Sequence, residues 1–156
     1  VNIFFGGNTM KRFLYSLLMV LVITCNAFAG KTPEELMDNY IKDFNTQKLK
    51  KVERNYSFPL IVIQNSKRTI HNEISTFLNF EKIRATGWEK SVINSVKTIL
   101  KKDKSAITQL NFSRINKEGI IYLTSEANYI LIRENENWYI SGIIIDGNTP
   151  LGIENN

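Results

Sequence analysis

Apolar and polar side chains alternate through the C-terminal part of the chain, and this pattern constrains the fold more than any other feature. The alternation predicts three strands, at residues 106–116, 120–133 and 138–146, because successive side chains of a strand point to opposite faces of a sheet. Polar turns at 116–119 and 134–137 separate the strands. Connections this short favour antiparallel pairing of consecutive strands.

The predicted sheet has one face for a core and one face that is available for contact. The residues expected to pack together in the core are Leu110, Phe112, Ala127 and Tyr129 from the sheet and Leu36, Tyr40 and Phe44 from an N-terminal helix. The outer face would offer apolar contact to another subunit through Tyr122, Ile130, Ile132, Ile143 and Ile145. A register error of one residue would exchange the two faces, so the burial of these side chains tests the predicted register of each strand.

The segments before this sheet predict helices and further strands. Thr32 and Pro33 mark a helix start, with a capping hydroxyl followed by a proline in the first helical position. The other predicted elements are a helix at 48–55, a strand at 58–64, a brief pairing segment at 68–70, a helix at 72–85 ended by Gly87, and a strand at 88–100.

The N-terminal segment has the layout of a secretory signal peptide. Basic residues at 11–12 precede an apolar run at 13–24 and an Ala-Phe-Ala sequence at 27–29. The run is shorter than the about 20 residues of a transmembrane span, which favours cleavage over an uncleaved anchor. We therefore expect export to the bacterial periplasm or beyond, removal of residues 1–29, and one domain over residues 30–156.

Met10 is the natural initiator, so residues 1–9 are interpreted as an extension from a start site placed too early. Cys25 is the only cysteine and lies in the segment expected to be removed. Lipidation of Cys25 is an alternative, although Thr24 is bulkier than the residue that normally precedes a lipidated cysteine. A mature chain without cysteine has no disulfide, thiolate nucleophile or cysteine-containing metal site.

The net charge of +5 comes with positive side chains clustered in two polar segments. They are Lys48, Lys50, Lys51 and Arg54 in the first and Lys97, Lys101, Lys102 and Lys104 in the second. No recognisable nucleic-acid-binding motif accompanies them, so a solvated surface is the favoured interpretation and no nucleic-acid partner is expected.

Three short patterns and the order of the predicted elements resemble a known superfamily. The patterns are YIKDFN at 40–45, TIHNEI at 69–74, and YILI at 129–132 followed by WYI at 138–140. They resemble the nuclear transport factor 2-like (NTF2-like) superfamily, which includes the SnoaL-like and ketosteroid isomerase-like families. The resemblance implies an α+β, cystatin-like fold in which N-terminal helices pack into a strongly curved, mostly antiparallel sheet. Such a sheet forms a cone with a pocket at its open end.

Ketosteroid isomerase chemistry needs a carboxylate base and an oxyanion hole made by a tyrosine and a protonated aspartate. The resemblance places Tyr40 at the tyrosine position, Gln64 at the base position and Ala127 near the protonated acid. Glutamine cannot abstract a proton and alanine cannot donate a hydrogen bond. The sequence therefore argues against this reaction.

His71 and Arg114 each allow two interpretations. His71 is the only histidine and precedes a predicted helix, where a capping or surface role competes with catalysis. Arg114 continues the apolar face of its strand, so it could meet a ligand acid at the pocket mouth or extend to water.

The sequence predicts a non-enzymatic domain that binds either a small apolar or amphipathic molecule or a protein partner, with no catalytic set, cofactor or metal. The expected pocket-lining residues are Tyr40, Gln64, Trp88, Phe112, Arg114 and Tyr129. A homodimer through the outer sheet face is a further possibility. The alternative is a hydrolase or isomerase that uses an unrecognised constellation around Tyr40, His71 and Arg114. A deep cavity would favour an enzyme, and a cone filled by side chains would favour an interaction domain.

Overall fold

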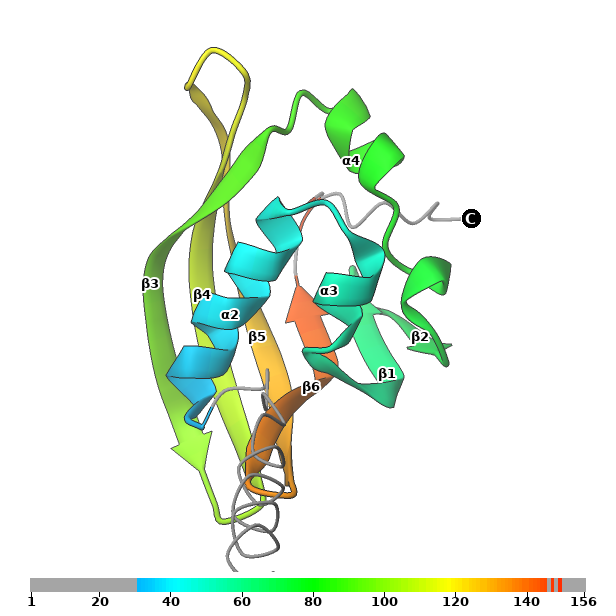
Figure 1. Ribbon diagram of the computed structural model, residues 1–156, viewed down its shortest axis with the longest axis vertical. Coiled ribbons are helices and arrows are strands. Elements are labelled where there is room, and N and C mark those ends of the chain that lie inside the picture. The colour runs from blue at the N-terminus through cyan, green and yellow to red at the C-terminus, as the bar shows by residue number, and fades with distance from the viewer. Residues whose placement is uncertain (1–30, 146, 148, 150–156) are drawn as a thin grey trace, which may run out of the picture.

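The structure is a computed structural model that describes residues 31–145, 147 and 149. Helices pack into a curved open sheet (Figure 1). The elements in chain order are α2 (Pro33–Asn45), α3 (Leu49–Glu53), β1 (Tyr56–Gln64), β2 (Lys67–His71), the 3-10 turn η1 (Ile74–Thr76), α4 (Phe80–Ala85), β3 (Lys90–Lys101), β4 (Ser105–Ile115), β5 (Ile121–Glu134) and β6 (Asn137–Ile145). The predictions for residues 1–29 and for residue 146 lie outside the described residues.

The six strands form one sheet in the order β2-β1-β6-β5-β4-β3. All neighbouring strands are antiparallel except β1 and β6, which are parallel. β6, the last strand among the described residues, therefore lies inside the sheet, between β1 and β5. The predicted fold class, α+β with helices packed into a mostly antiparallel sheet, is confirmed.

The predicted strands at 106–116, 120–133 and 138–146 correspond to β4, β5 and β6, and each described end agrees within one residue. The predicted first helix is α2, and its N-terminus is a capping box. The Thr32 hydroxyl accepts a hydrogen bond from the Glu35 backbone N–H at 3.1 Å, and the Glu35 carboxylate accepts one from the Thr32 backbone N–H at 3.3 Å.

The prediction of one helix at residues 72–85 is wrong. The turn η1 is followed by an irregular stretch, and α4 begins only after Asn79. The Asn79 side chain accepts a hydrogen bond from the Lys82 backbone N–H at 3.1 Å and caps the new helix. Phe77 and Leu78 are both buried. The backbone is not helical in this stretch, with φ of −132° at Phe77 and −130° at Asn79, and both apolar side chains reach the core.

Two β-bulges change which residues lie on the outer face of the sheet, compared with the prediction. Ser141 is an extra residue in β6, because consecutive residues of β5 pair with Ile140 and Gly142. A bulge exchanges the faces of the residues that follow it. Ile143 and Ile145 therefore point into the core, each with 2% of its surface exposed, and their predicted place on the outer face is wrong.

Tyr122 is also misplaced by the prediction. Arg114 and Ile115 of β4 pair with Leu123 and Ile121, which leaves Tyr122 as the bulged residue of β5. Its hydroxyl lies 3.1 Å from the hydroxyl of Thr86, which follows α4. Tyr122 thus turns to the side of the sheet that carries the helices.

The predicted core is confirmed. All of its members are buried: Leu36, Tyr40, Phe44, Leu110, Phe112, Ala127 and Tyr129. The Phe44 ring also meets Phe80 at 5.1 Å and Trp88 at 5.3 Å between ring centroids. The interior of the cone is therefore aromatic as well as aliphatic.

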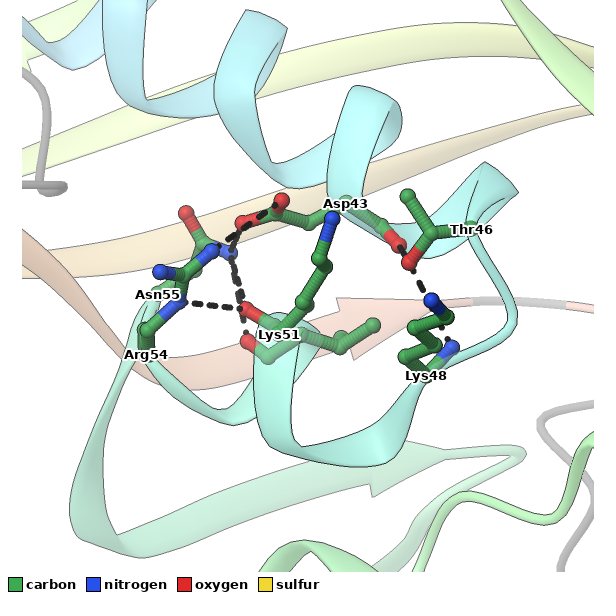
Figure 2. A network of polar contacts seen from close by, with 7 residues as sticks. Asp43, Thr46, Lys48, Lys51, Arg54 and Asn55 are labelled. Atoms are coloured by element: carbon green, nitrogen blue, oxygen red, sulfur yellow. Dashed lines mark hydrogen bonds and ion pairs between the residues drawn. The ribbon is translucent and has the colours of Figure 1, made fainter.

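A polar network holds α2, α3 and the start of β1 together (Figure 2). Asn55 is 1% exposed, and its side-chain amide donates to the Asp43 carboxylate at 2.9 Å and to the Val52 carbonyl at 3.2 Å. Asp43 also forms an ion pair with Arg54 at 3.6 Å. The Asn55 carbonyl accepts a hydrogen bond from the Ile140 backbone N–H at 2.8 Å, which links the network to β6.

Candidate functional site

Three tyrosine rings meet inside the cone. The Tyr40 ring of α2 lies 5.8 Å from Tyr56 of β1 and 5.6 Å from Tyr129 of β5, measured between centroids. Burial raises the pKa of all three phenols, because a buried phenolate would lose its hydration. The three hydroxyls are therefore neutral at physiological pH and serve as hydrogen-bonding groups, not as bases.

Arg114 of β4 reaches the same region and is 2% exposed, so its guanidinium does not extend to water. Burial lowers its pKa, and a hydrogen bond to Tyr122 together with the nearby phenols of Tyr40 and Tyr129 opposes that shift. An arginine stays protonated in proteins. The cone thus holds one cation next to a group of neutral phenols.

A cavity of about 20 Å³ lies beside this cluster. It is lined by Tyr40, Ile41, Phe44, Ser91, Phe112 and Arg114. Such a volume holds about one water molecule, whereas small-molecule sites typically have about 300 Å³ or more. The side chains fill this part of the cone.

Gln64 and Trp88, which were expected to line the pocket, have other partners. The Gln64 amide donates to the backbone carbonyls of Gly147 at 3.3 Å and Thr149 at 2.9 Å. The Trp88 indole N–H donates to the Ser91 hydroxyl at 3.0 Å. The cavity therefore brings together Tyr40, Phe112 and Arg114 of the expected set, with Tyr129 behind Tyr40.

Trp88 instead borders a wider, open groove between α4 and the β4–β5 turn. This groove has a volume of about 580 Å³ and mixed charge. Its lining residues are Glu81, Arg84, Ala85, Gly87, Trp88, Asn116, Lys117 and Glu118.

His71 ends β2 and is held by two hydroxyls. Its Nδ1 lies 3.0 Å from the Thr76 hydroxyl, and its Nε2 lies 2.9 Å from the Thr69 hydroxyl. The Thr76 hydroxyl already donates to the Glu73 carbonyl at 2.7 Å, so it accepts from Nδ1–H. The Thr69 hydroxyl lies within hydrogen-bonding distance of both Nε2 and the Val62 carbonyl oxygen, the latter at 3.5 Å. Burial lowers the pKa of His71, which favours the neutral imidazole.

The Phe77 ring separates His71 from the tyrosines. Its centroid lies 5.4 Å from the His71 ring and 5.4 Å from the Tyr56 ring. The alternative constellation of Tyr40, His71 and Arg114 is therefore interrupted by an apolar ring.

The outer face of the sheet carries a row of apolar positions that crosses all six strands. In the pairing register the row runs through Ile70 of β2, Ile61 of β1, Gly142 of β6, Ile130 of β5, Ile107 of β4 and Leu100 of β3. The exposed fractions are 65% for Ile70, 46% for Leu100 and 39% for Ile61. A Cβ added at Gly142 would lie 3.0 Å from Ile130, so the glycine lets this isoleucine lie across β6.

Sequence reasoning found Ile130 in this row and missed the other five positions, because they come from five different strands. Ile132, also predicted on the outer face, is half-buried. The signal that could have found Ile61 is the alternation within β1, which places it opposite the buried Leu60 and Val62.

Among residues 31–145, 147 and 149, no three His, Cys, Asp or Glu side chains lie close enough together to hold a metal ion. The helices in this part of the chain are also too short or too polar to cross a bilayer.

Helices packed into an open, curved sheet with a parallel β1–β6 pair define the NTF2-like class of α+β domains. Residues 32–148 match the family described as NTF2-like protein (DUF6841), and the chain belongs to this family. The resemblance inferred from the sequence is thereby confirmed.

Solved structures with the same fold have diverse descriptions. A candidate calcium/calmodulin dependent protein kinase II association domain from Xanthomonas campestris is 18% identical, with a TM-score of 0.54 over 72% of this chain and 83% of the other. A candidate aromatic ring hydroxylase from Novosphingobium aromaticivorans is 12% identical, with a TM-score of 0.57 over 75% and 87%. A candidate ketosteroid isomerase from Shewanella frigidimarina is 9% identical, with a TM-score of 0.52 over 70% and 89%.

At such identities the likeness concerns the fold alone, and the fold hosts unrelated functions. No curated protein sequence matches this chain.

Proposed function

We propose that the protein is an exported, non-enzymatic interaction domain whose outer sheet face binds a second copy of the chain. The observation that carries this proposal is the apolar row across all six strands, together with the filled cone. An exposed contiguous apolar patch favours a protein partner, and a filled cone leaves little room for a substrate.

The size and layout of the outer face suit a dimer. Six strands span about 24 Å at about 4.8 Å per spacing, and strands of this length run about 30 Å. The resulting face of roughly 700 Å² is close to the roughly 800 Å² that each partner of a stable complex buries. A two-fold axis near Gly142 would place the Ile61–Ile70 half of the row on the Ile107–Leu100 half of the partner's row. Both copies would then use the same surface patch.

Sedimentation equilibrium tests this proposal. The natural chain is expected to form a dimer, and Ile61→Lys combined with Ile130→Lys should give a monomer, because a buried unpaired charge opposes association. Ile120→Lys is the matched control, since Ile120 is 59% exposed but lies outside the row. A monomeric natural chain, or a control that dissociates as readily, would contradict the proposal.

A second candidate function is binding of a small amphipathic molecule inside the cone. The observation that favours it is the buried Arg114 beside Tyr40 and the small cavity, which could widen around a ligand with an anionic end. Arg114→Met should then weaken binding of an anionic amphiphile such as a fatty acid and reduce its salt dependence. His71→Ala should leave binding nearly unchanged, and turnover of a steroid, epoxide or polyketide that His71→Ala abolishes would favour an enzyme.

Export is a separate part of the proposal and rests on the layout of residues 1–29. Protein recovered from the envelope should begin at Gly30. Recovery of mature protein that still contains residues 11–29 would contradict cleavage.

A further inference from the structure

The β3–β4 hairpin differs from the rest of the surface in its chemistry. Residues 97–104 read Lys-Thr-Ile-Leu-Lys-Lys-Asp-Lys and include four lysines and one aspartate. All four lysines are exposed. Between them lie two large apolar side chains that are also exposed, Ile99 at 54% and Leu100 at 46%.

The backbone of the hairpin presents these side chains in a fixed arrangement. The Lys102 N–H donates to the Ser105 carbonyl at 2.8 Å and closes the turn. The Arg133 N–H donates to the Lys104 carbonyl at 3.0 Å, which ties the turn to β5. Ile99 is a bulged residue with no counterpart on β4, and a bulge turns its side chain out of the regular pleat.

The described chain begins at the same end of the molecule. The Glu34 carboxylate in the first turn of α2 accepts a hydrogen bond from the Thr98 hydroxyl, and Lys101 lies close enough to help lower the Glu34 pKa. Figure 1 shows the start of α2 and the β3–β4 turn at one end. The hairpin therefore lies beside the N-terminal end of the described domain.

We propose that the β3–β4 hairpin is a peripheral docking site for an anionic lipid membrane. Ile99 enters the headgroup region, and Lys97, Lys101, Lys102 and Lys104 contact anionic headgroups around it, while Leu100 remains part of the outer-face row. An exposed apolar side chain within a lysine cluster suits a membrane surface. The apolar side chain is buried at the boundary between headgroups and acyl chains, and the lysines are attracted to the anionic headgroups.

A nucleic acid fits the hairpin less well. Single-stranded nucleic acids are bound by aromatic side chains that stack on bases, and residues 97–104 contain none. The acidic neighbours outside the hairpin have partners in the protein: Glu34 is bonded to Thr98, Glu134 accepts a hydrogen bond from Ser57 at 3.3 Å, and Glu136 pairs with Arg133 at 2.8 Å. Asp103 remains within the hairpin as an opposing charge.

Vesicle cosedimentation of the full chain tests the proposal and does not depend on self-association. Vesicles of phosphatidylcholine with about one-third phosphatidylglycerol should bind the chain more strongly than phosphatidylcholine alone. Each lysine near an anionic surface contributes roughly five-fold, so K101Q/K102Q/K104Q should weaken binding about 100-fold. The matched control is K48Q/K50Q/K51Q, which removes the same charge from α3 and its N-cap and should change binding little. Both variants keep residues 13–24, so a difference between them comes from the domain.

Ile99→Ser tests the apolar part of the site. It should weaken binding several-fold and make the remaining binding more sensitive to salt, because the apolar side chain no longer inserts and only charge attraction remains. Three results would overturn the proposal: equal binding to both kinds of vesicle, an equal loss in both lysine variants, or tighter binding to a DNA oligonucleotide than to the anionic vesicles.

Discussion

The two faces of the sheet carry similar apolar side chains and differ in what covers them. On the inner face, Phe112 and Tyr129 meet α2, and the packing leaves a cavity of only about 20 Å³. On the outer face, Ile61 and Ile70 pair across two strands and are 39% and 65% exposed. The inner face therefore stabilises the fold, whereas the outer face is available for binding.

This comparison shows why alternation alone does not identify a binding surface. A strand with apolar residues on both faces reads as a buried strand, and β1 has Leu60 and Val62 on one face and Ile61 on the other. Only the position of the helices decides which face is the core. The following predictions test this division, from the largest expected effect to the smallest.

Phe112→Ala should lower the free energy of unfolding by about 3–5 kcal/mol, because it removes buried aromatic surface and leaves a cavity. Ile107→Ala is the control, since Ile107 lies on the same strand and the opposite face, and it should cost about 1 kcal/mol. Urea denaturation at low protein concentration measures both. A cost below about 1 kcal/mol for Phe112→Ala would mean that the faces are reversed.

Alkaline pH should unfold the protein through the inner face. The pKa values of Tyr40, Tyr56 and Tyr129 are raised by burial, so the unfolded chain releases these protons first. Stability is therefore complete below the ordinary tyrosine pKa of 10.0 and falls as the pH rises above it. Tyrosinate absorbance and circular dichroism should change together. Titration of all tyrosines while the fold persists would place these phenols in contact with water.

Ile70→Ser should change the free energy of unfolding by less than about 0.5 kcal/mol in dilute protein, because the side chain is mostly exposed in the single chain. In concentrated protein the same substitution should weaken the proposed dimer. Thermal melts over a range of protein concentrations separate the two effects. A large loss in dilute protein would mean that Ile70 belongs to the fold, not to a binding surface.

His71 should produce the smallest effect, at mildly acidic pH. Burial lowers its pKa below the ordinary value of 6.5, so the unfolded chain takes up a proton more readily. Stability should therefore be constant above this value and decline slightly as the pH falls through it. In His71→Gln, which cannot titrate, this step should vanish from the pH dependence of the denaturation midpoint.

Local signals explain what could be predicted from the sequence. Alternation located β4, β5 and β6, and the Thr32 cap located the start of α2, because each depends on residues close together in the chain. The inner residues Phe112 and Tyr129 followed from the same alternation.

The misplaced features depend on contacts between distant segments. The bulge at Ser141 lies where β6 pairs with β1 on one side and β5 on the other, and the residues of β6 alone do not indicate it. Asn55 becomes a buried junction only when Asp43 and Ile140 are brought to it. The small cavity depends on rings from α2 meeting rings from the sheet, so its volume could not be predicted from the sequence.

The central position of β6 has a consequence for the newly made chain. β6, the last strand among the described residues, separates β1 from β5, so the β1–β2 pair cannot join the main sheet until residues 137–145 have left the ribosome. Pairing between such distant segments is slow, because a long loop must close before the contacts stabilise it. Completion of the sheet therefore waits for β6, and the β1–β2 hairpin stays unattached to β5 until then.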